Sequence, residues 1–292
     1  MPNKIRIEHL SNESKSDFIR VVNKSVSRWS YVRRIDEELL RHWQTSISYQ
    51  PENILVLYEG GQSVAVLHGE IRKEGRAIVH LLATLPGEVE GAIRLLERFE
   101  SRARENGSTG LIGPHHVTKK FYGGFILGAE PYHPHWAVEA TEAYTSAGWM
   151  VNQTAVLMIR GLADAIDLEA HPGGYEVVEA TPEDEYSADV FGFHASREGE
   201  RAALCYARWY PHLFDPTGGS VGQIGNVRTE EGHRSRGLAR TLVKRCLEKL
   251  QGFGASRVLI ATGFDNAPAL RAYERAGFQR RHFLFVWEKN FE

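Results

Sequence analysis

Residues 226–243 constrain the fold of this 292-residue chain more than any other stretch, because a strand-like segment, a polar turn and a helical segment follow one another there. Gly232 permits a sharp change of direction within the turn. After Gly237 the apolar residues recur at helical spacing and form one stripe, at Leu238, Leu242, Val243, Cys246, Leu247 and Leu250. The stretch therefore predicts a strand that leads through a glycine-containing turn into an amphipathic helix.

The turn has the features of an anion-binding site. The first backbone N–H groups of a helix lack intrahelical acceptors, and the helix dipole adds partial positive charge there. Gly237 would let an anion approach the backbone closely, and Arg234 and Arg236 add positive charge. The spacing matches neither the P-loop nor the G-x-G-x-x-G fingerprint. The turn therefore favours a phosphate or pyrophosphate ligand, and the alternative is a surface turn capped by arginines.

A second stretch repeats the order of a strand followed by a helix. Residues 257–262 form a short aliphatic run that predicts a buried strand. Asn266 or the residue before it can cap the next helix, and Gly277 can end that helix. Ala269 and Tyr273 lie on one helical face, so a small side chain beside the phenol leaves room for a ligand.

Together the two stretches resemble the signatures of the GCN5-related N-acetyltransferase (GNAT) superfamily. Arg234-Ser-Arg-Gly-Leu-Ala239 matches the pyrophosphate-binding signature R/Q-x-x-G-x-G/A. Residues 266–278 match N-x-x-A-x-x-x-Y-x-x-x-G-F at every fixed position. The resemblance covers roughly residues 174–292. It implies an α/β (α+β) fold with a mixed, mostly antiparallel sheet flanked by helices. It also implies transfer of an acetyl group from acetyl-CoA to a primary amine of a small molecule or peptide by direct attack.

The resemblance also implies which residues bind the cofactor. The backbone of Val227, Arg228 and Thr229 would pair with the pantetheine amides in the manner of an added strand. The pyrophosphate would be held by the turn and the helix start, namely Arg234, Ser235, Arg236, Gly237, Leu238, Ala239 and Arg240. Asn266 and Ala269 would lie near the pantetheine arm.

Two residues are candidates for proton transfer. Tyr273 would act as general acid by donating to the departing thiolate, and the alternative is a tyrosine packed in the core. The amine must also lose a proton, because an alkylamine has a pKa near ~10. The strand that ends at Thr229 carries no carboxylate, and its Gln223 and Asn226 can only orient a water. His194 is therefore a candidate base, and a chain of waters is the alternative.

The N-terminal half repeats the plan of the C-terminal half. Tyr144-x-x-x-Gly148-Trp149 parallels Tyr273-x-x-x-Gly277-Phe278 at an offset of 129 residues, which indicates an internal duplication. We predict two tandem acetyltransferase-type domains, residues 1–163 and 174–292, with residues 164–173 as the linker.

The first copy differs at the anion-binding turn. Its corresponding residues, Leu85-Pro-Gly-Glu-Val-Glu-Gly91, contain two acids and no arginine, and the acids would repel a pyrophosphate. We therefore predict a degenerate copy that shapes the acceptor pocket. Its expected helices are 13–29, 34–47 and 91–104, with another ending near residue 148, and its expected strands are 5–10, 54–58, 63–70, 77–84, 110–113 and 154–160.

The strands expected early in the second copy are 188–194, 201–210 and 221–229. The middle one is ambiguous, because its alanines would also suit a helix. Only about a dozen residues separate the first strand of this copy from Ala188, which leaves little room for helices. We therefore expect a cleft that is more open on one side.

Residues 121–136 are rich in aromatic residues, histidine and glycine. His133 and His135 resemble a metal-binding pair, but no third ligand with suitable spacing is evident. We therefore expect no metal, and interpret the segment as an acceptor-pocket wall or as core packing. Its glycine-rich part, residues 121–128, leaves open a transferase for a longer acyl group. The missing base leaves open a non-catalytic acyl-CoA-binding or sensing protein.

The composition limits the partners and the location. A formal net charge of −2 provides no bulk attraction to nucleic acid or to an anionic membrane. Cys205 and Cys246 are the only cysteines, which argues against a disulfide scaffold and for a reducing compartment. The sequence contains no 18-residue apolar run and no apolar leader. We expect a cytoplasmic monomer or homodimer.

Overall fold

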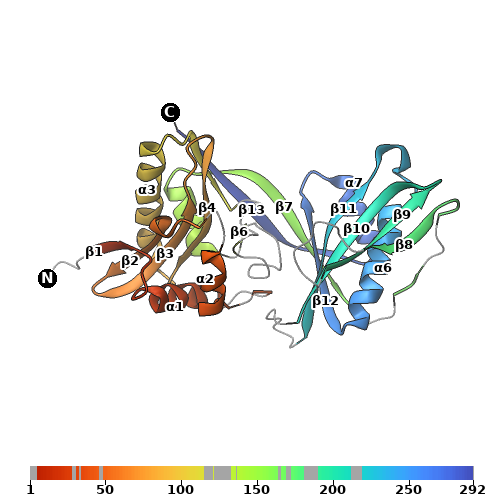
Figure 1. Ribbon diagram of the computed structural model, residues 1–292, viewed down its shortest axis with the longest axis horizontal. Coiled ribbons are helices and arrows are strands. Elements are labelled where there is room, and N and C mark those ends of the chain that lie inside the picture. Colours follow the sequence, from red (N-terminus) through yellow and green to blue (C-terminus); the bar gives the residue numbers. More distant parts are fainter. Residues whose placement is uncertain are drawn as a thin grey trace. The chain divides into compact units, whose positions relative to one another are not determined.

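A computed structural model describes residues 5–27, 31–32, 34–45, 49–114, 121, 133–135, 137–163, 166–168, 172–180, 190–211 and 219–291 (Figure 1). Contacts divide the chain into two compact units. The N-terminal unit comprises Met1–Thr154 and Phe283–Glu292, and the C-terminal unit comprises Ala155–His282. Among the described helices, none has the length and apolar character needed to cross a membrane.

The N-terminal unit is built on a mixed, mostly antiparallel sheet with the strand order β1-β2-β3-β4-β5-β13. Within this sheet β4 and β5 are parallel, and short β6 pairs with β13. The strands are β1 (Ile5–His9), β2 (Ile54–Glu59), β3 (Gln62–Glu70), β4 (Arg76–Thr84), β5 (Gly110–Gly113), β6 (His133–Pro134) and β13 (Gln279–Asn290).

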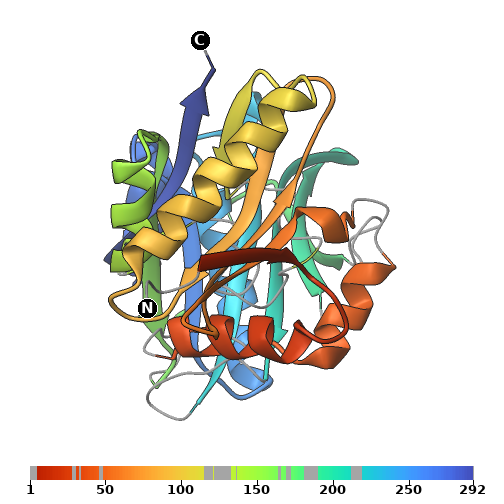
Figure 2. The ribbon, with the colours of Figure 1, turned by 90° about the vertical axis from the view of Figure 1, so that its left-hand side faces the viewer.

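Helices cover both faces of this sheet (Figure 2). They are α1 (Lys15–Ser25), α2 (Glu37–Gln44), the short 3-10 helix η1 (Pro51–Asn53), α3 (Val89–Glu105) and α5 (Val138–Ser146). On one face the Phe99 ring of α3 fills the space above Gly69. On the other face Trp43 of α2 stacks on His68, with ring centroids 5.0 Å apart. His68 and Gly69 are adjacent in β3, so they point to opposite faces.

In the C-terminal unit the strand order is β7-β12-β11-β10-β9-β8. Its strands are antiparallel except for the β11–β12 pair, which is parallel. Its strands and helices are β7 (Met150–Gly161), β8 (Glu176–Ala180), β9 (Val190–Arg197), β10 (Glu200–Tyr210), β11 (Ser220–Thr229), β12 (Ala255–Gly263), η3 (Glu231–His233), α6 (Leu238–Gly252) and α7 (Ala267–Arg275). Both units thus have the mixed, mostly antiparallel sheet with helices that the motifs implied.

The core of the C-terminal unit lies between its strands and the helices α6 and α7. The stripe expected along α6 is buried throughout, from Leu238 to Leu250. Leu270 and Tyr273 of α7 belong to the same apolar cluster, so α6 and α7 cover the same face. Both cysteines are buried free thiols in this cluster, and the sulfurs of Cys205 and Cys246 lie 3.5 Å apart.

The ambiguous segment 201–210 is a strand and not a helix. Its alternate residues explain this outcome. Cys205 and Ala207 belong to the core cluster under α6, and Trp209 packs against that cluster, while Tyr206 and Arg208 point to the other face. The open cleft expected before Ala188 falls on residues 181–189, which lie outside the described residues.

Two helices are shorter than expected. The helix expected over 13–29 is α1, which ends at Ser25, and the helix expected over 34–47 is α2, which begins at Glu37. The start of α2 is set by Asp36, whose Oδ1 accepts a hydrogen bond of 2.9 Å from the Leu39 amide. Local capping therefore decided a boundary that the hydrophobic periodicity left open.

Contacts and sequence copies divide the chain at different points. Strands β7 and β13 each begin in one unit and end in the other, so residues 283–292 belong to the N-terminal unit and residues 155–163 to the C-terminal unit. The sequence copies 1–163 and 174–292 therefore do not coincide with the contact units at these two places. The boundaries 1–163 and 174–292 therefore stay a prediction from the sequence repeat.

Candidate functional site

Strand β11 changes character halfway along its length. Residues 221–224 are buried, whereas residues 225–229 are half-buried or exposed. The last β11 residue that pairs with β12 is Ile224, opposite Ile260. Beyond this pair β12 continues alongside β7, so β11 and β12 separate. The edge of residues 225–229 that faced β12 is therefore not used by that strand.

A β-bulge lies at the point of separation. Asn226 has a φ of +50°, and the register between β10 and β11 shifts between Leu204 and Tyr206. Such a bulge bends the strand and re-aims the backbone groups that follow it. The bulge was not predicted from the sequence, although the Gly225-Asn226 pair inside a strand is a signal for it, because both residue types tolerate a left-handed backbone.

The turn after β11 has eight residues, 230–237, between Thr229 and the start of α6. Ser235 and Gly237 have φ values of +61° and +81°, and Gly237 occupies the N-cap position of α6. The first turn of α6 contains no acidic residue. The arrangement therefore presents the first amides of α6 at an exposed turn, without a Cβ at the N-cap position and without a competing carboxylate in the first turn.

The two arginines of the turn make long hydrogen bonds to backbone carbonyl groups. Arg234 Nε donates to the Thr229 carbonyl at 3.3 Å, and Arg236 Nη2 donates to the Gly232 carbonyl at 3.4 Å. Both side chains are exposed. Because these are long hydrogen bonds to neutral carbonyls, an anion at the turn can attract both guanidinium groups more strongly.

A tyrosine outside the turn anchors it. Tyr175, just before β8, is hydrogen-bonded through its hydroxyl to His233 Nδ1 at 2.9 Å. The Glu230 amide also donates to the Ala202 carbonyl at 2.9 Å, which ties the start of the turn to β10. No motif pointed to Tyr175, because the two ring-bearing residues are 58 positions apart in the chain.

Helix α7 carries the other cofactor-site candidates. Asn266 is its N-cap: its Oδ1 accepts from the Ala269 amide at 3.3 Å, and its Nδ2 donates to Thr262 Oγ1 at 3.1 Å. Ala269 is partly buried against the core, and Tyr273 is 6% exposed. The sequence expectation that Asn266 caps this helix is therefore confirmed.

His194 lies apart from these residues. It is half-buried on β9 and pairs with Leu204, at the level of the bulge. Its neighbours in sequence, Phe193 and Ala195, pack on the α6 side of the sheet. His194 therefore points to the opposite face. The structure thus brings together the turn, the end of β11 and the α6–α7 pair, and places the candidate base across the sheet from them.

The N-terminal unit has the same framework with different contents. Its parallel strands also part early, after Ile78 pairs with Ile112, and a register shift between β3 and β4 leaves His80 as the extra residue. The turn after β4 has only four residues, 85–88, and the N-cap of α3 is Glu88. This turn is half as long as its counterpart and has a carboxylate where an anion would have to bind.

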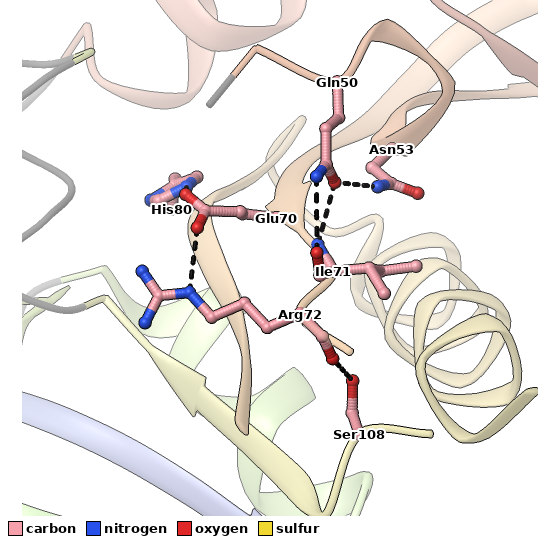
Figure 3. Close-up of polar contacts among 7 residues, drawn as sticks. All are labelled: Gln50, Asn53, Glu70, Ile71, Arg72, His80 and Ser108. Carbon is pink, nitrogen blue, oxygen red and sulfur yellow. Dashed lines mark hydrogen bonds and ion pairs between the residues drawn. The ribbon is translucent and has the colours of Figure 1, made fainter. Parts of the chain in front are cut away.

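At the bulge of the N-terminal unit lies a buried polar cluster (Figure 3). Arg72 Nε donates to Glu70 Oε1 at 2.8 Å, and His80 Nε2 lies 3.4 Å from Glu70 Oε2. Burial by itself raises the pKa of Glu70, but the hydrogen bonds from His80 and Arg72 outweigh it and lower that pKa to about 2. Gln50 and Ser108 hydrogen-bond the backbone of Ile71 and Arg72 beside the cluster.

His133 is part of a separate aromatic cluster in the same unit. Trp287 Nε1 donates to His133 Nδ1 at 3.3 Å, and Tyr144 stacks on Trp287 with ring centroids 5.4 Å apart. Burial lowers the pKa of His133 to about 3, so its ring is neutral. These contacts favour the packing interpretation of His133, while most of residues 121–136 lie outside the described residues.

Comparison with known proteins agrees with this geometry. Residues 163–278 match the family model described as the acetyltransferase (GNAT) family. The mycothiol acetyltransferase of Corynebacterium aurimucosum is 36% identical over 105 residues, which cover 35% of this chain and 34% of that protein. The alignment thus spans about a third of that relative's length.

Solved structures match over nearly the whole chain. A GCN5-related N-acetyltransferase from Sphaerobacter thermophilus has a TM-score of 0.69 at 14% identity, covering 99% of this chain and 96% of that one. A tandem GNAT protein from the clavulanic acid biosynthesis pathway has a TM-score of 0.69 at 15% identity, covering 98% of both chains. Residues 163–278 thus resemble the acetyltransferase (GNAT) family in sequence, and the chain as a whole shares its fold with these solved structures.

Proposed function

We propose that the chain is an acetyl-CoA-dependent N-acetyltransferase that acetylates a primary amine of a small molecule or peptide by direct attack. The observation that carries this proposal is the eight-residue turn after a strand that separates from its neighbour. One edge of β11 and the first amides of α6 are then available together. The mycothiol acetyltransferase relative supports acetyl transfer as the reaction type.

The donor would lie along β11 and end at the turn. Arg234, Arg236 and the amides of residues 235–240 would hold the pyrophosphate, because they combine positive charge with backbone donors. The pantetheine arm would pair with the backbone of residues 227–229, running back along the strand from the turn. Asn266 and Ala269 would lie beside the arm. The thioester would then be near Gly225, where β11 and β12 begin to separate.

Tyr273 would act as the general acid. It lies on α7, which packs against α6, and its phenol would donate a proton to the departing thiolate of coenzyme A. Removal of the amine proton would take place on the other face of the sheet. There His194 is at the level of the bulge, and waters held by Gln223 or Asn226 are the alternative route.

The N-terminal unit would not bind the donor. Its turn is short, Glu88 occupies the N-cap position of α3, and Glu90 lies in the first turn of that helix. An anion at that helix start would meet two carboxylates, so we propose that only the C-terminal unit binds acyl-CoA.

Two measurements on the full chain test the proposal. Calorimetry with coenzyme A and acetyl-CoA should detect one site for each chain. Release of free thiol from acetyl-CoA should then depend on an added primary amine, with the acetylated amine identified by mass spectrometry. Absence of binding would contradict the proposed acyl-CoA site. Binding without amine-dependent thiol release across a broad panel would establish a non-catalytic acyl-CoA-binding protein instead.

A comparison of donors settles the acyl length. Acetyl-, butyryl- and octanoyl-CoA would be compared at the same amine concentration. We expect acetyl-CoA to have the largest kcat/KM. A preference for the octanoyl donor would replace acetyl transfer by transfer of a longer acyl group while leaving the site residues unchanged.

A further inference from the structure

We propose that Cys205 and Cys246 form a reversible disulfide when a small uncharged peroxide oxidises the protein, and that this bond weakens acyl-CoA binding. The site of the modification is set by the fold of the C-terminal unit alone. Its effect on the donor rests on the proposed function, so the two parts are tested by separate measurements.

The two thiols are in contact inside the C-terminal unit. Cys205 on β10 and Cys246 on α6 are both 0% exposed, and their sulfurs lie 3.5 Å apart although the residues are 41 positions apart in the chain. The Cys246 sulfur is also 3.7 Å from the Cys205 carbonyl oxygen, so it lies against the backbone of the other cysteine. A disulfide has an S–S distance of about 2.05 Å, so the sulfurs would have to approach by about 1.5 Å.

Small neighbours let the helix and the strand come this close. Ala203 and Ala207, two positions before and after Cys205 in β10, belong to the same buried cluster as the thiols. A strand lined with alanine permits a closer approach of the helix than one lined with larger side chains, and a disulfide needs its two backbones close together. The sequence contains no other cysteine, so no other thiol of the chain competes for either partner.

The reaction with a peroxide balances without a further reagent. The sulfur of one cysteine attacks a peroxide oxygen, the O–O bond breaks, and a sulfenic acid and one water form. The second sulfur then attacks the sulfenic sulfur, the S–O bond breaks, and a second water leaves. Two electrons pass from the sulfurs to the peroxide, and the two thiol protons end in the two waters. A small uncharged oxidant is required, because both sulfurs are buried.

The reduced pair is the resting form. Burial and the neighbouring Cys205 raise the pKa of the Cys246 thiol, so this thiol is protonated. A protonated thiol is a poor nucleophile, so we expect the bond to form slowly, as a response to sustained oxidation and not during turnover. Disulfides of proteins in reducing compartments are usually transient in this way.

The bond would join the two elements that make the donor site. Strands β10 and β11 shift register between Leu204 and Tyr206, so Cys205 is the β10 residue at the bulge, opposite Asn226 and Val227. Cys246 is on α6, the helix that starts at the turn proposed to hold the pyrophosphate. Protein interiors are close-packed, so an approach of about 1.5 Å between the sulfurs must displace the strand, the helix or both. The edge of β11 and the first amides of α6 would then lose their alignment.

The test compares reduced, peroxide-treated and dithiothreitol-recovered protein. Wild type, Cys205→Ala and Cys246→Ala are treated with hydrogen peroxide under native conditions. Peptide mapping by mass spectrometry identifies linked or oxygenated cysteines, and calorimetry measures the affinity for coenzyme A. Both variants keep the methionines of the chain, so an effect of methionine oxidation would appear in them as well. Hydrogen exchange of residues 226–240 reports on the donor site without any ligand.

We expect treated wild type to lose two hydrogen atoms and to yield one linked peptide pair within a single chain. Its affinity for coenzyme A should fall about tenfold, the equivalent of one charge-assisted hydrogen bond, and dithiothreitol should restore it. Each single variant should bind coenzyme A as reduced wild type does, before and after the peroxide. Exchange at residues 226–240 should change in treated wild type only.

Two results would overturn the inference. Treated wild type whose cysteines stay free, or gain oxygen without linking, would show that the pair is not a disulfide site. A linked form with the affinity and the exchange pattern of the reduced protein would show that the bond does not act on the donor site. Reduced wild type that does not bind coenzyme A would contradict the proposed function, and the peptide map and the exchange pattern would still decide this inference.

Discussion

Tyr144 and Tyr273 occupy the same position at the ends of two similar helices, in surroundings that differ. The Trp149 amide donates to the Tyr144 carbonyl and the Phe278 amide to the Tyr273 carbonyl, each at 3.0 Å. The glycine before each aromatic residue is left-handed, with φ of +77° at Gly148 and +87° at Gly277. This is the Schellman ending of a helix, in which the residue after the glycine contacts the first residue of the motif.

The comparison shows what the Tyr-x-x-x-Gly-aromatic spacing encodes. The spacing specifies a helix end in both units, so it cannot by itself distinguish a catalytic tyrosine from a structural one. Tyr144 is 1% exposed among His133, Trp149 and Trp287, and burial raises the pKa of its phenol far above the ordinary value. The groups around the tyrosine, and not the motif, decide what the phenol can do.

The same contrast holds at the bulges. In the C-terminal unit the bulge residue Asn226 is exposed, and the strand beyond it has an edge with which β12 does not pair. In the N-terminal unit the bulge residue His80 is fully buried against Glu70 and the aromatic ring of Phe121. One framework thus leaves a strand edge without β12 beside it, while the other fills the equivalent place with side chains.

The largest expected effect comes from the tyrosine pair. Tyr273→Phe should lower kcat about 100- to 1000-fold, because a general acid typically contributes factors of this size. Its affinity for acetyl-CoA should stay nearly unchanged. Tyr144→Phe is the matched control and should leave kcat within about twofold, because its buried phenol has no role in the proposed transfer. An equal fall in kcat in the two variants, or no fall in Tyr273→Phe, would contradict the proposed difference between the two tyrosines.

The second test concerns the turns. Arg234→Ala combined with Arg236→Ala should weaken acyl-CoA binding about 50-fold, since each charge-assisted hydrogen bond contributes about 1.5–3 kcal/mol and the exposure of both side chains reduces the sum. Calorimetry measures the change. Replacing Glu88 and Glu90 by Gln should not create a second site in the N-terminal unit, because its turn stays four residues long. A second site in that variant would show that charge alone separates the two copies.

The third test measures the buried cluster of the N-terminal unit. Glu70→Gln should destabilise that unit by about 2–3 kcal/mol at pH 7, because it removes a carboxylate whose pKa is lowered by His80 and Arg72. Hydrogen exchange of the β4 amides reports on the local stability, and Glu74→Gln at an exposed site is the control. Acyl-CoA affinity should not change.

The pH dependence of this effect has a definite sign. A carboxylate with a lowered pKa stabilises the fold fully above its unfolded value and loses this contribution as the pH falls. The advantage of wild type over Glu70→Gln should therefore be constant above about pH 4.5 and shrink as the pH falls towards 2. An advantage that grows on acidification would contradict the assignment.

The fourth test examines what the copies share. Gly148→Ala and Gly277→Ala should each cost about 1 kcal/mol, because alanine pays that amount in a left-handed conformation. The cost should be somewhat larger at Gly277, where a Cβ would lie 3.2 Å from the Arg160 guanidinium, than at Gly148, where the nearest atom is at 3.9 Å. Thermal unfolding measures both, and a neutral Gly277→Ala would argue against the shared helix ending.

The smallest expected effect concerns how each turn is held. Tyr175→Phe removes the hydrogen bond to His233 and should raise the KM for acetyl-CoA about threefold with kcat retained, in line with the net value of one such bond. Thr84 Oγ1 donates to the Glu88 carbonyl in the N-terminal unit at 2.8 Å, and Thr84→Val should not affect that KM. A fall in kcat with unchanged KM would contradict the proposal that Tyr175 supports acetyl-CoA binding by anchoring the turn.

Local patterns in the sequence were sufficient for much of this protein. The stripe along α6, the Asn266 cap and the two helix endings follow from residues at most a few positions apart, because periodicity and capping are short-range effects. The repeated ending also led to the prediction of a duplication. The strand reading of 201–210 was correct but ambiguous, since alanine suits a helix until the sheet is known.

Only the tertiary structure decided how these elements make a site. The bulge at Asn226, the separation of β11 from β12 and the contact between Tyr175 and His233 depend on strand register and on residues far apart in the chain. The same holds for residues 283–292, which complete the sheet of the N-terminal unit although they end the second sequence copy. The residues of a strand do not by themselves specify which strand will pair with it, because the packing of the whole sheet selects the pairing and the register.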